Sequence, residues 1–304
     1  MKRFDNIFRG KSGEIKIGWL LALAACLYLL AEGVYYGYWS VYGMMMDVWG
    51  ITENNVMRAP AAVRLLYRWS GVIGQLMRNT VLAASGILLC RLTNTDLKNA
   101  EEKKGRFWGP AALGAAGVTG LWCLLMLTGS VRLGWRITKP VFSVNTFALL
   151  LTNLSAAAAE GIFLYGAVYG SMKKRLPVWA ARGVVAGIAA LMIAPTGVGA
   201  AVLVNILLMS VALCLLTDAY GVLPMAGFGF AWNYLCQAVF GFAGASAALY
   251  ETYPVNLYWL NGGNSGVMYG AAVTLILTAI IFRQIKAVGM IKELLRKARS
   301  KSPS

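Results

Sequence analysis

Polar side chains within long apolar stretches are the residues of this sequence that could do chemistry. Glu160, Asn153, Asn233 and Gln237 each lie inside such a stretch. A charged or amide side chain in hydrocarbon is costly unless it finds a partner, so such residues are functional candidates by default. A carboxylate in this setting can act as a general base, and amides can donate hydrogen bonds to a bound group.

The spacing of these four residues predicts that they share a site. Asn153 and Glu160 are seven positions apart, which is two helical turns, and so face the same way on one helix. Asn233 and Gln237 are four positions apart and share a face of another. We expect the two faces to form one polar pocket between helices.

Asn205 is a further candidate for a binding residue, because it carries an amide within an apolar run, and Tyr165 is also predicted to be one. A structural role competes with the functional one. The amides can simply join neighbouring helices by hydrogen bonds, and Glu160 can pair with Arg78 or with an amide.

The elements that must position these residues are predicted to be transmembrane helices. Of the 304 residues, 59% are hydrophobic and only 13% charged, whereas a soluble domain carries roughly a quarter charged residues. A spanning helix needs about 20 apolar residues. The sequence predicts an all-α membrane protein, a bundle of eight spans at 17–38, 70–90, 107–129, 143–170, 178–195, 199–217, 222–242 and 264–283.

The distribution of positive charge predicts the orientation of the chain. The net charge is +16, and the large majority of the 28 Lys and Arg residues fall on one side of the eight-span arrangement. Basic residues mark the cytoplasmic side, so we expect both termini in the cytoplasm of a multi-pass protein, such as one of a bacterial plasma membrane. Basic residues placed between apolar runs set topology, and nucleic acid is therefore not an expected partner.

The sequence predicts one polytopic membrane domain over residues 1–304. Its end, 284–304, places Ile285, Val288 and Ile291 on one helical stripe among Lys and Arg residues. Such a basic amphipathic tail is predicted to lie on the anionic inner leaflet.

Two motifs in the second half resemble those of a known family. Residues 159–166, Ala-Glu-Gly-Ile-Phe-Leu-Tyr-Gly, are similar to a Glu-Glu-x-x-x-Arg-Gly helix, and residues 227–234, Gly-Phe-Gly-Phe-Ala-Trp-Asn-Tyr, to a His-x-x-x-Asn helix. Their order and spacing resemble those of the CPBP intramembrane proteases, which include the CAAX-protease and Abi proteins. The likeness covers about 143–245, the protease-like core. It implies that Glu160 holds the position of the general base and Asn233 that of the oxyanion-binding amide.

Departures from the family pattern remove most of the implied catalytic centre. The second Glu of the motif is Gly161, its Arg is Tyr165, and the His four residues before the Asn is Gly229. The family's other His, expected near Ala194, is also missing, and the chain contains no His at all. A catalytic zinc needs three protein ligands, so we predict no metal and no cofactor.

The sequence therefore favours a catalytically inactive relative of these proteases. Its expected partners are the lipid bilayer and a membrane or lipidated peptide or membrane protein, held in the former active-site cavity. Two alternatives stay open. One is an active intramembrane peptidase that uses Glu160, and the other is a small-solute transporter, although the internal repeats typical of transporters are not evident.

Overall fold

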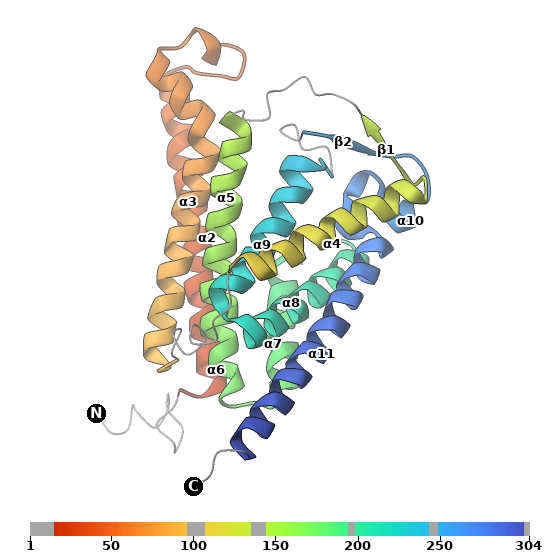
Figure 1. Ribbon diagram of the computed structural model, residues 1–304. Coiled ribbons are helices and arrows are strands. Elements are labelled where there is room, and N and C mark those ends of the chain that lie inside the picture. Colours follow the sequence, from red (N-terminus) through yellow and green to blue (C-terminus); the bar gives the residue numbers. More distant parts are fainter. Residues whose placement is uncertain (1–14, 96–106, 135–143, 194–197, 243–248, 301–304) are drawn as a thin grey trace, which may run out of the picture.

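The computed structural model describes residues 15–95, 107–134, 144–193, 198–242 and 249–300. Most of these residues are helical, and the helices form two groups (Figure 1). In the first group α2, α3 and α5 stand side by side, and α5 continues through η3, a π-helix, into α6. The bounds are α2 Ile17–Val48, α3 Ala61–Leu92, α5 Val144–Glu160, η3 Gly161–Val168 and α6 Tyr169–Lys173.

In the second group α8 packs against α7, α9 and α11, and α9 contacts both α4 and α5 and so joins the two groups. A π-helical turn, η5, extends α9. The bounds are α4 Trp108–Leu127, α7 Val178–Ile193, α8 Ala200–Tyr220, α9 Val222–Tyr234, η5 Leu235–Val239, α10 Tyr258–Asn261 and α11 Ala271–Ser300. The start of α2 and the end of α11 lie at the same end of the molecule (Figure 1).

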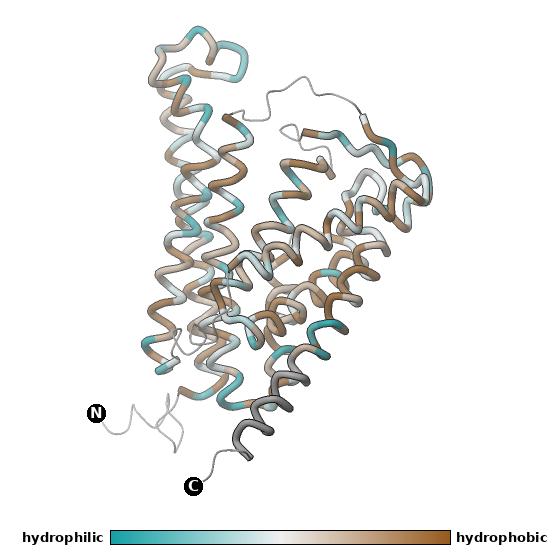
Figure 2. The backbone as a smooth tube through the Cα atoms, viewed as in Figure 1, coloured by the Kyte–Doolittle hydropathy of each residue, from teal (hydrophilic) through white to brown (hydrophobic). Residues whose placement is uncertain are grey.

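Five helices are long and apolar enough to cross a membrane. Hydrophobic residues run along most of their length, and hydrophilic residues gather near the helix ends and at the turn between α2 and α3 (Figure 2). A membrane interior offers no water to the backbone, so an apolar chain satisfies its N–H and C=O groups within helices. The prediction of a helical membrane protein is thus confirmed. The five helices are Ile17–Val48, Ala61–Leu92, Trp108–Leu127, Val144–Lys173 and Ala200–Tyr220.

Several predicted boundaries differ from the structure. Helices α2 and α3 have 32 residues each, or about 48 Å, so their shared turn projects beyond the rest of the molecule. The last predicted run starts late, at Ala271, because Gly262 and Gly266 have positive φ angles and break the helix. From Ala271 the helix continues without interruption to Ser300, so the basic tail extends α11 and does not form a separate helix.

A small antiparallel sheet is an exception to the predicted all-α architecture. Strand β1 (Val131–Gly134) pairs with β2 (Glu251–Pro254), and Val131 lies opposite Pro254. The amide of Asn261 donates to the carbonyl of Ser130 at 2.6 Å and ties the sheet to α10. Both strands lie in connecting segments between apolar runs, where hydrophobicity predicts no spanning helix.

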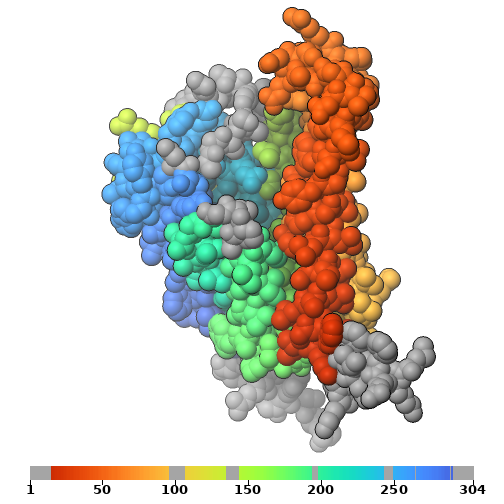
Figure 3. Space-filling model, turned by 180° about the vertical axis from the view of Figure 1, so that it is seen from behind, coloured from red at the N-terminus to blue at the C-terminus, as the bar shows by residue number. Residues whose placement is uncertain are grey.

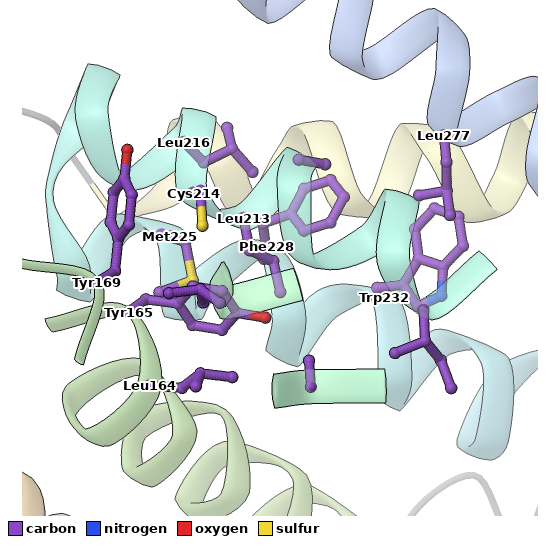
Figure 4. Packing of buried hydrophobic residues seen from close by; sticks show 14 of the residues in the cluster. Leu164, Tyr165, Tyr169, Leu213, Cys214, Leu216, Met225, Phe228, Trp232 and Leu277 are labelled. Carbon is purple, nitrogen blue, oxygen red and sulfur yellow. The ribbon is translucent and has the colours of Figure 1, made fainter. Parts of the chain in front are cut away.

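The core lies where η3, α8 and α9 meet (Figure 4). The ring of Phe228 stacks on that of Trp232 at 5.9 Å, and both side chains are almost fully buried. Gly86 of α3 allows the first group to approach η3 closely, because a Cβ atom there would lie 2.8 Å from the Cα of Phe163. The backbone positions that carry Glu160 are therefore set by tight helix packing.

Candidate functional site

A cavity of about 450 Å³ lies between η3, α7, α8 and α9. Its wall is mostly apolar, and four methionines, Met192, Met209, Met225 and Met268, contribute to it. Figure 4 shows Leu164 and Tyr165 from η3, Leu213 from α8 and Met225 from α9, all of which line the cavity. The polar and charged lining residues are Tyr28, Arg78, Glu160, Tyr165, Ser210, Asn233, Gln237 and Ser265.

Glu160 occupies the junction between two kinds of helix. It is the last residue of α5, directly before the π-helix η3. Its side chain lines the cavity and is exposed there. Among the residues that the structure describes, it has no hydrogen-bond or ion-pair partner. The carboxylate is therefore available to a bound group.

The π-helix itself had no counterpart in the predictions. A π-helix closes its hydrogen bonds from i to i+5, so it changes the faces on which the following side chains project. Such turns are often found at functional sites. The four alanines before Glu160 and the glycine after it give no sign of the π-helix in the sequence.

Asn233 and Gln237 reach the cavity from α9 and η5, and both side chains are exposed to it. Asn153 lies behind Gln237, since its Nδ2 donates to the Gln237 Oε1 at 3.1 Å and to the Leu149 carbonyl at 2.8 Å. The structure thus places Glu160, Asn233 and Gln237 around one cavity, as predicted. Asn153 is a supporting residue and does not line the cavity.

Tyr165 and Asn205 have different positions. Tyr165 lines the cavity, and its hydroxyl donates to the Ser210 Oγ at 3.3 Å. Asn205 does not line it. Its Nδ2 donates to the carbonyl of Met268 at 2.7 Å, and its Oδ1 accepts from Thr274 at 2.7 Å, so it joins α8 to the start of α11. These contacts indicate a structural role for Asn205, and its predicted role in binding stays a prediction.

Arg78 is paired with another carboxylate, not with Glu160. Its Nε and Nη2 donate to the Glu32 Oε1 at 2.8 and 2.5 Å, and so join α3 to α2. The neighbouring Asn79 donates to the Ser155 Oγ at 2.9 Å and joins α3 to α5. The sequence shows charged residues in both apolar runs, but it does not show that the two helices are adjacent.

A second ionic cluster was not predicted. Asp218 of α8 accepts from Arg182 of α7 at 2.7 Å, from Lys173 at 2.5 Å and from the Tyr169 hydroxyl at 2.6 Å. The guanidinium of Arg182 also lies over the ring of Trp179 at 4.4 Å. This cluster holds α6, α7 and α8 together and lies outside the lining of the cavity. A single carboxylate among basic residues near helix ends is the sequence signal that could have revealed it.

The zinc centre that the family resemblance implies does not fit this cavity. Zinc needs three protein ligands from His, Cys, Asp or Glu. Within the described part of the chain, no three such side chains converge. The wall offers one carboxylate, Glu160, and one thiol, Cys236. The position near Ala194, where the family has a His, lies outside the described residues.

Comparisons with family models, with curated proteins and with solved structures found no match for this chain.

Proposed function

We propose that this chain is a membrane-embedded binding protein without peptidase activity, which takes part of a membrane or lipidated peptide into the cavity. The observation that carries the proposal is the mixed character of the wall. Glu160, Asn233 and Gln237 present polar groups to a cavity whose other lining residues are mostly apolar. Ligand sites typically have this composition, since apolar walls supply affinity and a few polar groups fix orientation.

The size of the cavity limits its occupant. About 450 Å³ falls within the range of 300–1,000 Å³ typical of ligand pockets. A helix has a diameter of about 10 Å with its side chains, so a spanning helix does not fit inside. The proposed occupant is an extended stretch of a few residues or the end of a lipid chain. Four methionine side chains are flexible enough to fit apolar groups of different shapes.

The family resemblance supports the same proposed function, binding without peptidase activity. It places a general base at Glu160 and an amide at Asn233, and both residues line the cavity. It also requires metal or water-holding histidines that the sequence lacks. We propose that the chain is a degenerate CPBP-type protein that keeps the peptide-binding cavity and has lost the catalytic step.

We further propose eight spans, a plasma-membrane location and cytoplasmic termini. Helices α7, α9 and α11 add to the five helices long enough to span by themselves. An even number of spans agrees with the start of α2 and the end of α11 at one end of the molecule. The basic residues concentrate on the side of the termini in this arrangement, as expected for the cytoplasmic side.

A cavity-filling variant tests the binding function. A Cβ atom at Gly229 would meet only the Cβ of Ala157, at 3.9 Å, and Gly229 lines the cavity, so Gly229→Leu fills the cavity without a backbone clash. Gly183→Leu is the matched control, because a Cβ atom at this helical glycine has nothing within 4 Å. The probe is a farnesylated apolar peptide with a photo-crosslinking group, offered to the protein in lipid nanodiscs.

We expect wild type and Gly183→Leu to crosslink the probe at cavity residues, and Gly229→Leu to lose most of the product. No cleavage of the probe is expected. Equal crosslinking in all three proteins would contradict the binding function. Cleavage by wild type that disappears in Glu160→Gln would instead identify an active peptidase, because replacing a general base by an amide lowers the rate by orders of magnitude.

A further inference from the structure

The charges of the ionisable side chains at the cavity do not cancel one another. Arg78 lines the cavity, but its Nε and Nη2 are bound to Glu32, and its Nη1 donates to the Asn79 Oδ1 at 3.3 Å. Glu160 lines the same cavity and, within the described residues, has no cation at hydrogen-bonding distance. Glu32 and Arg78 are near enough to Glu160 for electrostatic interaction. With both carboxylates ionised, these three residues carry one negative charge in excess.

An unpaired carboxylate in an apolar cavity is costly, and a positive charge beside it removes much of that cost. The amides of Asn233 and Gln237 offer only neutral donors, whereas a cation would form a charge-assisted hydrogen bond with the carboxylate, which is stronger. The Gln237 side chain is also fixed in orientation, because its Oε1 accepts a hydrogen bond from the Asn153 Nδ2. A bound positive group would therefore stabilise the ionised form of Glu160.

The remaining wall specifies the rest of the ligand. Leu164, Ile206 and Leu213 line the cavity together with the four methionines, and none of these side chains can pair with a second charge. A ligand that fits carries its charge at one point and is apolar elsewhere.

We infer that the cavity binds an apolar ligand through a single positive group, an ammonium or guanidinium that pairs with Glu160. This inference rests on the proposed binding function and adds to it the chemical class of the occupant. Two sources can supply this chemistry. One is a Lys or Arg side chain in an apolar peptide, and the other is a free single-chain amine in the bilayer.

The experiment uses the farnesylated photo-crosslinking peptide in two forms, one with Lys beside the crosslinker and one with norleucine, which has a similar aliphatic chain without charge. The bilayer of the nanodisc is made of net-neutral lipid, so surface attraction does not favour the Lys form. Four proteins are compared: wild type, Glu160→Gln, Glu53→Gln and Gly229→Leu. Glu53 is exposed and is not among the cavity residues, so its variant controls for a change of net charge.

We expect the Lys peptide to crosslink about tenfold more than the norleucine peptide in wild type and in Glu53→Gln, as a charge-assisted hydrogen bond predicts. The preference should vanish in Glu160→Gln. Equal crosslinking of the two peptides in wild type, with both blocked in Gly229→Leu, would overturn the charge inference while leaving the binding function intact. A Lys preference that persists in Glu160→Gln would also overturn it. Crosslinking in Gly229→Leu at the level of wild type would instead contradict the binding function itself.

A competitor distinguishes the two sources. Dodecylamine that displaces the Lys peptide from wild type, where dodecanol does not, would show that a free amine suffices. Resistance of the crosslink to dodecylamine, together with the Lys preference, would assign the positive group to a peptide side chain. The Glu160 carboxylate is the recognition group in both cases.

Discussion

The guanidinium of Arg78 donates both its Nε and one Nη2 hydrogen to a single oxygen of Glu32, and so joins α3 to α2 at the edge of the cavity. Helix α2 forms one side of the molecule along its whole length (Figure 3). This ion pair fixes a long peripheral helix to the rest of the bundle. It also leaves Glu160 without the arginine that the sequence offered as its partner.

Removal of one member of this pair should destabilise the protein. Arg78→Met leaves Glu32 uncompensated, which costs about 3–5 kcal/mol for a fully buried pair. Both side chains keep some exposure, 15% and 20%, so we expect a smaller loss. Thermal unfolding in detergent measures it, and the double variant Arg78→Met with Glu32→Leu should recover part of the stability. An equally stable single variant would contradict a structural role for the pair.

Gly86 should not tolerate even a methyl group. The Cβ of Gly86→Ala would lie 2.8 Å from the Phe163 Cα, a backbone atom that cannot move aside cheaply. Overpacking of this kind costs typically about 1–3 kcal/mol. Gly71→Ala in the same helix is the control, because a Cβ there has nothing within 4 Å and alanine favours helix by about 1 kcal/mol. Denaturation midpoints should therefore move in opposite directions for the two variants.

The cluster around Asp218 should contribute to stability and not to binding. Asp218→Asn removes the carboxylate partner of Arg182, which is only 5% exposed, and breaking a buried pair costs about 3–5 kcal/mol. Lys173→Met should cost only about 0–1 kcal/mol, since the Lys173 side chain is 42% exposed. Unfolding curves of both variants check the difference. Reduced crosslinking at the cavity in a folded Asp218→Asn protein would argue against the separation of the two sites.

Asn205 should behave as a structural residue. Asn205→Ala removes the donors to the Met268 and Gly270 carbonyls and the acceptor of Thr274, a loss of roughly 1–3 kcal/mol for buried groups left unsatisfied. The crosslinking yield of the farnesylated probe in the folded variant should match wild type. A selective loss of crosslinking with unchanged stability would restore Asn205 as a binding residue.

The proposed orientation is open to a direct test. A reporter that is active only outside the cytoplasmic membrane, fused after Ser304, should give no signal, and one inserted at Glu53 in the turn between α2 and α3 should be active. A strong signal from the C-terminal fusion would contradict the cytoplasmic termini.

The sequence alone determined the class of the protein and part of the site. Long uncharged runs dictate spanning helices because the bilayer leaves the backbone no other partners. The common pocket of Glu160, Asn233 and Gln237 was predicted from the polar residues and their helical spacing, and these three side chains line one cavity. Asn153, which was predicted to share the pocket, instead donates to Gln237. Hydrophobicity did not predict the strands β1 and β2 or the late start of α11 at Ala271. These features depend on the connecting segments.

Only the tertiary structure decided which polar residues face one another. Arg78 pairs with Glu32 because α2 packs on α3, and Asn205 accepts from Thr274 because α8 packs on α11. Helical periodicity gives the direction of a side chain around its own axis, but not the neighbour that the direction meets. Arg78, which lines the same cavity as Glu160, is bound to Glu32 of another helix, and within the described residues Glu160 has no hydrogen-bond partner.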